Sequence, residues 1–343
     1  MRILLIGGNG FIGSFVAAAL LERGHVVGVF HRGTKPAPAG VIEIRGDCNQ
    51  LHASAEELKR FAPDAVIGLI LSSGSQAEAL TNCFRGATQR VVMLSSIDVY
   101  RAVGISQGTE SGPLQEVPLT EDSELRRNLH PYPPEQMEVM RKVFPWATDD
   151  YDKIPAERIV MCDRKLPGTV LRLPMIYGPG DPLHRFYPVT KRIRDGRRHI
   201  VFPATLADWR APRGYVENVA SAIALAATDD RATGRIYNIC EEPSFSELEW
   251  ARKIASAMHW KGEFVILPVE STPPHLIKRG NAAQHWSASS ARIRHELGYR
   301  EPVAIEEAIG RTIRWDLENS TAVEFLPPLD YAAEDAAIAG RSL

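Results

Sequence analysis

The chain opens with Arg2-Ile3-Leu4-Leu5-Ile6 and continues directly into Gly7-Gly8-Asn9-Gly10-Phe11-Ile12-Gly13. The first stretch is a short apolar run typical of a buried strand, and the Ala-rich residues 14–21 predict an amphipathic helix. Strand, glycine turn and helix in this order are the context in which such glycine spacing indicates a dinucleotide site rather than an ordinary tight turn. Gly7 permits the turn, Gly10 lets the backbone approach a pyrophosphate, and Gly13 lets helix and strand pack closely.

The helix behind the glycines offers free N–H groups at its N-terminus, where the helix dipole favours negative charge. We therefore expect the pyrophosphate of a dinucleotide at this point. The residues of the turn expected to contact the cofactor are Gly7, Asn9, Gly10, Phe11, Ile12 and Gly13.

The composition is that of a globular protein with one large or two closely joined domains. The 343 residues are 44% hydrophobic and 24% charged, with a formal net charge of -2. This balance gives no electrostatic reason to expect a nucleic acid or a membrane surface as partner. The four cysteines lie far apart and the ten histidines are scattered, so we expect free thiols and no metal site. The first strand starts at residue 2 and no apolar run reaches membrane-spanning length, which favours a cytoplasmic protein.

The second apolar run, residues 24–30, completes a strand–helix–strand unit. An acidic residue after this strand would bind the ribose hydroxyls of NAD, whereas an arginine accommodates the 2′-phosphate of NADP. The chain has His31-Arg32-Gly33-Thr34-Lys35 here and no acid. Arg32 therefore favours NADP over NAD, the alternative being an ordinary surface arginine. Residues 41–45 form a third expected strand, after which Asp47 is either an adenine contact or an N-cap.

Two further apolar stretches, residues 64–71 and 90–94, predict central parallel strands covered on both faces. Strands alternating with helices behind a glycine turn indicate an α/β, Rossmann-type doubly wound parallel sheet. Ligands of such sheets bind at the carboxyl ends of the strands. Ser95 and Ser96 lie at the end of the fifth strand.

Several later segments, together with the glycine turn, share the pattern of one known family. They are Ser-Ser-x-x-Val-Tyr at 95–100, Pro-Leu-Thr-Glu-Asp at 118–122, and residues 171–180, 214–220, 237–239, 297–299 and 305–309 with Trp315. On these segments the chain resembles the extended short-chain dehydrogenase/reductase superfamily, in the NAD-dependent epimerase/dehydratase group.

The resemblance implies a division of the chain into two parts and a tail. Residues 1–175 would build the nucleotide-binding domain, to which 213–240 would return. Residues 176–212 and 241–325 would form a smaller C-terminal substrate-binding lobe. The tail, 326–343, is Ala-rich with acidic residues, and it is either a packed helix or a frayed end.

The resemblance also implies a catalytic group of Ser or Thr, Tyr and Lys. The tyrosine would act as acid or base, and the lysine would lower its pKa and hold the nicotinamide ribose. Ser96 stands at the serine position, its alternative role being to cap the strand end.

The expected Tyr-x-x-x-Lys spacing is broken in this sequence. Counted from Tyr151, the lysine position holds Pro155, and counted back from Lys153, the tyrosine position holds Asp149. Pro155 belongs in a first helical turn, which predicts a helix starting near Asp152 with Tyr151 in a non-helical lead-in. Tyr151 as acid/base and Lys153 on the ribose are our predictions, with Asp149 as the open alternative.

The region between Ser96 and this helix is longer than the resemblance implies. The extra residues, 126–148, form either a lid with Arg127, His130 or Tyr132 as substrate contacts, or a surface excursion. Met175 occupies a slot where many nucleotide-sugar enzymes of the family carry an asparagine. Methionine cannot form the corresponding hydrogen bond. This argues against a nucleotide-sugar as the substrate and favours a smaller carbonyl or hydroxyl compound. Arg210, Arg213 and Tyr177 are the expected substrate contacts.

We therefore predict an NAD(P)-dependent oxidoreductase or epimerase/dehydratase that transfers hydride to or from a small-molecule substrate. By analogy with the family, a homodimer is possible. The alternative is a dinucleotide-binding sensor or interaction protein that has lost turnover, which the broken spacing motivates. RNA binding is a third, weaker option, because basic patches interleaved with aromatic residues are lacking.

Overall fold

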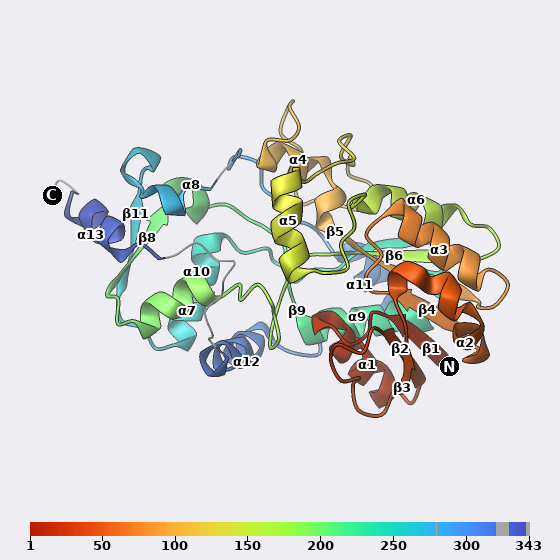
Figure 1. Cartoon of the computed structure of the whole chain (residues 1–343). Helices are drawn as coiled ribbons and strands as arrows, with labels where there is room; N and C mark the ends of the chain where they lie inside the picture. The colour runs from red at the N-terminus through yellow and green to blue at the C-terminus, as the bar shows by residue number, and fades with distance from the viewer. Residues whose placement is uncertain (279, 320–328, 341–343) are drawn as a thin grey trace.

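A single parallel sheet forms the larger part of the molecule (Figure 1). The computed structural model describes residues 1–278, 280–319 and 329–340. The sheet has seven strands in the order β10-β6-β5-β4-β1-β2-β3, and every pair is parallel. The strands are β1 (Arg2–Ile6), β2 (Val26–His31), β3 (Ile42–Arg45), β4 (Ala65–Gly68), β5 (Arg90–Ser96), β6 (Gly168–Leu173) and β10 (Ile236–Asn238). This strand order reverses between β1 and β4, which confirms the Rossmann-type prediction.

Successive residues of a strand face two different cores. Ile3 and Leu5 of β1 join the apolar cluster under α1 (Phe11–Glu22) and α9 (Val216–Thr228). Leu4 and Ile6 join the cluster under α3 (Gly74–Phe84) and α6 (Lys153–Cys162) on the opposite face. Because both faces are covered, the strands read as continuous apolar runs.

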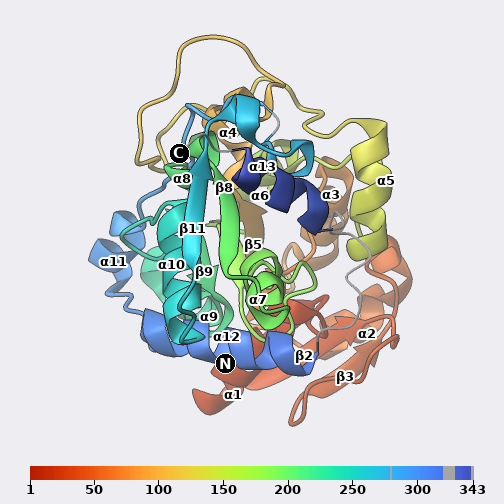
Figure 2. The same cartoon turned by 90° about the vertical axis from the view of Figure 1, so that its left-hand side faces the viewer.

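The second part of the molecule is built around two short parallel pairs, β8 (His199–Pro203) with β11 (Glu263–Leu267) and β7 (Met175–Tyr177) with β9 (Arg213–Tyr215). The helices α7 (Tyr187–Arg194), α10 (Glu247–Ala257) and α12 (Ile305–Glu318) pack against one another there. A short helix, α8 (Ala204–Ala207), contacts both β8 and α10. In Figure 1 these elements lie to the left of the sheet, and Figure 2 views them face on.

The C-terminal tail forms a packed helix, α13 (Tyr331–Ala339), within its described residues 329–340. Glu334 is fully buried and forms an ion pair with Arg192 of α7. His275 lies 3.1 Å from the same carboxylate. Of the two expectations for the tail, the packed helix is therefore correct for these residues, while 326–328 and 341–343 lie outside the described part.

The expected boundary of the substrate-binding lobe differs from the structure at α11 (Ala291–Leu297). This helix was expected inside the lobe, in 241–325, but it contacts β10 at the edge of the large sheet. Glu296 of α11 accepts hydrogen bonds from Tyr237 of β10 and from Arg235. These contacts join segments about 60 residues apart in the chain. A pattern in neighbouring residues could therefore not predict them.

The residues between β5 and α6 contain two helices, α4 (Arg101–Gln107) and α5 (Pro134–Val143). The helix α5 lies within the segment 126–148. In Figure 1, α5 stands between the large sheet and the second part of the molecule. No helix in the described ranges is long and apolar enough to cross a membrane.

A buried ion pair connects the sheet to α6. The Arg172 guanidinium of β6 donates to both oxygens of Glu157, at 3.0 and 2.7 Å. Ser95 Oγ donates to the same carboxylate at 2.5 Å. Arg172 also donates to Tyr100 Oη at 2.9 Å, and the Tyr100 hydroxyl donates to Asn238 of β10. One guanidinium therefore connects β5, β6, β10 and α6.

Replacing Arg172 by Leu leaves the Glu157 charge buried without its partner. We expect the free energy of unfolding to fall by about 3–5 kcal/mol, measured by urea denaturation. The matched control is Arg231→Ala, since the Arg231 side chain is 64% exposed in its pair with Asp229; its effect on the free energy of unfolding should be much smaller than that of Arg172→Leu. Equal losses in the two variants would contradict this account.

Candidate functional site

The glycine turn has the open backbone that a pyrophosphate requires. Gly7 has a φ of +87°, a conformation that favours glycine. A Cβ on Gly13 would lie 2.7 Å from the backbone of Gly8, so the close packing of helix on turn needs glycine there. A Cβ on Gly10 would meet only Gly7 O, at 3.9 Å. No side chain caps the N-terminus of α1, so the turn fits a dinucleotide as the sequence predicts.

The residues expected around the adenosine half gather at the ends of β2 and β3. Asn9 Nδ2 donates to His31 Nδ1 at 2.7 Å, which connects the glycine turn to the end of β2. Arg32 is exposed. Asp47 caps the helix that follows it by accepting from the backbone N–H of Asn49 at 3.0 Å, which is the alternative role named for it above.

A cavity of about 280 Å³ lies at the carboxyl ends of β4, β5 and β6. It begins at Phe11 and Ile12 beside the glycine turn and contains Ser96, Tyr151 and Lys153. All three predicted catalytic residues thus line one space. The further lining residues are Leu69, Leu94, Ser95, Asp98, Tyr132, Met140, Phe144, Trp146, Leu173, Pro174, Ile176, Asp181, Pro182, Leu183 and Arg185.

Lys153 is the first residue of α6, and Asp152 caps that helix through the N–H of Ile154. The predicted helix start near Asp152 is therefore confirmed. Lys153 Nζ donates to the backbone oxygens of Leu71 at 2.5 Å and Leu94 at 3.0 Å. Burial lowers the pKa of Lys153 to about 8, although the negative charge of Asp98 acts in the opposite direction.

Tyr151 and Asp149, the two open candidates for the acid/base, lie in different environments. The Asp149 side chain is 93% exposed and paired with Arg141 of α5. The Tyr151 ring is buried in the cavity wall, with its centroid 6.0 Å from Lys153 Nζ. Burial, followed by the negative charge of Asp98, raises the pKa of Tyr151 well above its usual value. Of these two residues, only Tyr151 lines the cavity.

Asp98 is a residue of the cavity that the sequence analysis did not single out. Its Oδ2 accepts from the Tyr132 hydroxyl at 2.9 Å, while its Oδ1 is buried and has no hydrogen-bond partner in the described part of the chain. Ser96 Oγ accepts from the Asp98 N–H at 3.2 Å and caps the short turn after β5. Asp98 could have been found from the sequence because it lies two residues after Ser96, at the end of a central strand.

Of the residues named for the 126–148 segment, the structure brings only Tyr132 to the cavity. His130 and Arg127 are exposed, and Arg127 pairs with Glu124. The segment is therefore part of the cavity wall rather than a surface excursion alone.

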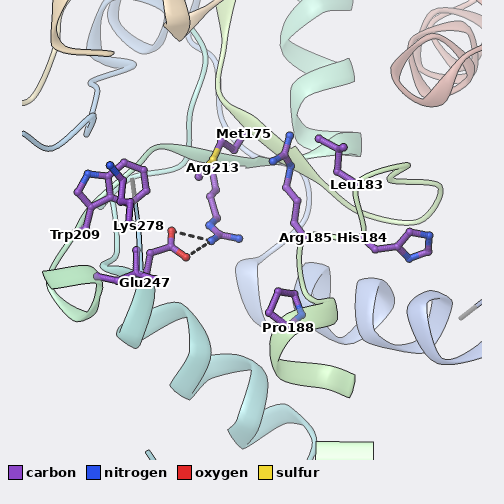
Figure 3. A pocket seen from close by; sticks show the side chains of 10 residues that line it. Met175, Leu183, His184, Arg185, Pro188, Trp209, Arg213, Glu247 and Lys278 are labelled. Carbon is purple, nitrogen blue, oxygen red and sulfur yellow. Dashed lines mark hydrogen bonds and ion pairs between the residues drawn. The ribbon is translucent and has the colours of Figure 1, made fainter. Parts of the chain in front are cut away.

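The three predicted substrate contacts, Arg210, Arg213 and Tyr177, lie in the second part of the molecule, and each has different neighbours. Arg213 lines a neighbouring cavity of about 470 Å³, but its guanidinium points at Glu247 and donates to both carboxylate oxygens, at 2.9 and 2.7 Å (Figure 3). Arg210 is paired with Glu249 at 2.8 Å. Tyr177 is buried in the core with its hydroxyl on Glu241, and it lines neither cavity. Arg185 lies between the two cavities and lines both.

Comparisons with known proteins show the family and the fold of the chain. The model of the "NAD dependent epimerase/dehydratase family" matches residues 3–240. A 2-alkyl-3-oxoalkanoate reductase from Stenotrophomonas maltophilia is 27% identical over 91% of this chain and 98% of its own. A dTDP-glucose 4,6-dehydratase from Streptomyces niveus is 26% identical over 99% and 100%. The crystal structure of a dTDP-glucose 4,6-dehydratase from Bacillus anthracis with NAD superposes with a TM-score of 0.67, at 14% identity, over 93% of this chain and 97% of that one.

The glycine turn and the parallel sheet define the class of Rossmann-type dinucleotide-binding proteins. The chain belongs to the NAD-dependent epimerase/dehydratase family, as the resemblance predicted. It is therefore a member of an NAD-dependent enzyme family, and the alternative of a sensor without turnover is not favoured.

The predicted contact of Lys153 with the nicotinamide ribose, together with its lowered pKa, gives an expected pH dependence of cofactor affinity. The ammonium form makes the stronger, charge-assisted hydrogen bond to a ribose hydroxyl, and it loses its proton near pH 8 in the free protein. The dissociation constant should be nearly constant below about pH 7 and rise up to about tenfold by pH 9.5. Fluorescence titration with reduced cofactor measures this. Lys153→Met should bind more weakly without the rise, while the exposed Arg158→Gln on the same helix should behave as wild type; an unchanged rise in Lys153→Met would refute the assignment.

Proposed function

We propose that this protein transfers hydride between NADP and a carbonyl or hydroxyl carbon of a small molecule bound at the carboxyl ends of β4, β5 and β6. The observation that carries the proposal is the shared cavity, which runs from Phe11 and Ile12 to Ser96, Tyr151 and Lys153. The bound nicotinamide supplies or accepts the hydride. Tyr151 and Ser96 contact the reacting oxygen, and Lys153 holds the ribose.

Tyr151 would act as the proton donor during carbonyl reduction. Its phenol is protonated at neutral pH, and burial and the charge of Asp98 raise its pKa further. A protonated phenol donates to a carbonyl oxygen that gains negative charge. Ser96 Oγ offers a second hydrogen bond to the same oxygen.

The relatives divide into two substrate classes by name. A 2-alkyl-3-oxoalkanoate reductase is named for an alkyl keto acid. A 2′-dehydrokanamycin reductase and further enzymes are named for sugar-containing compounds or nucleotide-sugars. Arg210 and Arg213, two of the expected substrate contacts, are both paired with glutamates. This supports a substrate without a diphosphate, in agreement with Met175 in place of an asparagine.

The end of β2 supports NADP over NAD. In NAD sites an acidic residue at this point binds the ribose hydroxyls, whereas here Arg32 follows His31, and its exposed side chain is available to a 2′-phosphate. Glu43 is the nearest acid, but it is engaged by Arg45 at 2.9 Å and lies 3.1 Å from His31.

Arg32→Ala tests the choice of cofactor. Losing one charge-assisted contact to the 2′-phosphate should weaken NADPH binding about tenfold or more and leave NADH binding within about twofold. Titration of both cofactors into wild type and variant gives the comparison, with Arg60→Ala, a surface arginine at the end of α2 (Ala55–Arg60), as control. Equal affinity of the wild type for NADH and NADPH would disprove the preference.

Tyr151→Phe tests the proton donor. With a carbonyl substrate that the wild type reduces, kcat should fall by about 100-fold or more, while the dissociation constant for NADPH stays unchanged. Absorbance at the reduced-nicotinamide band measures turnover. Tyr331→Phe, which removes a surface hydroxyl paired with Asp195, should keep full activity. Full turnover in Tyr151→Phe would rule out the assignment.

A further inference from the structure

The segment 126–148 adds an apolar wall to the cavity, and nothing in the glycine turn or the catalytic residues requires it. Met137 of α5, Ala147 and Tyr151 are buried against one another. This small core holds α5 next to the cavity. The Tyr132 ring packs edge to face on Tyr151, with centroids 5.5 Å apart. The wall is therefore attached directly to the proposed proton donor.

A second set of side chains from the same segment faces the cavity itself. Met140, Phe144 and Trp146 line it and are only half-buried. The Phe144 and Trp146 rings lie 5.6 Å apart. Burying such apolar surface against a ligand is favourable in proportion to the area removed from water. Tyr132, the other member of this wall, already uses its hydroxyl on Asp98.

The same cavity also has a polar lining. Ser96, Asp98 and Lys153 line it at the ends of the strands and the start of α6, with Asp181 and Arg185 as further charged residues. Lys153 Nζ lies 5.6 Å from the centre of the Trp146 ring, so the polar groups, where the reacting oxygen would be held, adjoin the carbon-rich surface formed by Met140, Phe144 and Trp146. A sugar ring carries hydroxyls on nearly every carbon, and each one needs a partner when it loses water. An aromatic ring can stack on a sugar face, but the Met140 thioether and the Phe144 ring supply no donor.

We propose that Met140, Phe144 and Trp146 form a subsite for an alkyl or aryl group next to the reacting carbon, so that the substrate is an apolar carbonyl compound or the corresponding alcohol. This inference rests on the proposed function, because it places the reacting oxygen at Ser96 and Tyr151. The segment 126–148 is then a specificity-determining element, and chain length on the carbonyl carbon controls affinity.

The test uses butan-2-one, hexan-2-one and octan-2-one as probes of the full-length protein saturated with NADP⁺, in which the ketones cannot accept hydride. Titration calorimetry measures each dissociation constant, and UDP-glucose is the polar comparison. Each methylene placed against the wall should tighten binding about two- to fourfold, so octan-2-one should bind at least about 15-fold more tightly than butan-2-one. UDP-glucose should bind more weakly than octan-2-one.

Phe144→Ala and Met140→Gln should each reduce this chain-length dependence to about twofold per two methylenes or less, with NADP⁺ affinity unchanged as the check that the variants are folded. Val139→Ala is the matched control, since Val139 is on the same helix and 49% exposed; it should keep the full dependence. Affinity independent of chain length in the wild type, or full dependence in both wall variants, would overturn the subsite.

The same panel separates this inference from the proposed function. Chain-length-dependent binding without hydride transfer from NADPH to any ketone or sugar would refute the proposed function and leave the apolar subsite standing. Turnover of UDP-glucose or another sugar, without chain-length dependence for the ketones, would support hydride transfer and overturn the subsite.

Discussion

The buried pair of Arg172 and Glu157 is the interaction on which the arrangement of the site depends. A guanidinium in the middle of a parallel sheet is costly unless a carboxylate and further acceptors surround it. Glu157 supplies that carboxylate from α6, and Ser95 adds a hydrogen bond from the end of β5. Because Lys153 lies one turn before Glu157 on the same helix, this pairing also brings the Lys153 ammonium over the ends of β4 and β5, where it meets the backbone oxygens of Leu71 and Leu94.

Most of the sheet could be predicted from the sequence because its signals are local. A central parallel strand is apolar throughout, and the glycine turn is defined by neighbouring residues, so both are visible in short windows. The strand expected over 64–71 proved shorter, Ala65–Gly68, since the chain after it turns toward α3 and Gln76 accepts hydrogen bonds from Ser72. The packing of α11 on β10 was not predictable in this way, because it depends on contacts between Glu296 and a strand about 60 residues earlier.

In the site, too, features set by neighbouring residues could be predicted from the sequence, whereas contacts between distant residues could not. Pro155 was sufficient to predict where α6 begins and therefore that Tyr151 precedes it. The pairing of Arg213 with Glu247 was not visible, since 34 residues separate them. The resemblance to the family made Arg213 an expected substrate contact, whereas the structure shows a cation whose charge is already offset by Glu247. The role of Asp98 was equally hidden, because it depends on Tyr132, which the intervening segment brings back to the strand end.

Burial shifts the two titrating groups of the cavity in opposite directions, and this links cofactor binding to the proton donor. It lowers the pKa of Lys153 and raises that of Tyr151, so each is moved toward its uncharged form in the cofactor-free protein. A dinucleotide brings hydrogen-bond acceptors and negative charge toward Lys153, which favours the ammonium. An ammonium about 6 Å from the Tyr151 ring in turn stabilises the phenolate that remains after proton donation. The broken Tyr-x-x-x-Lys spacing therefore does not remove the electrostatic reason for having both residues, because what the chemistry needs is their proximity in the cavity rather than a shared helix face.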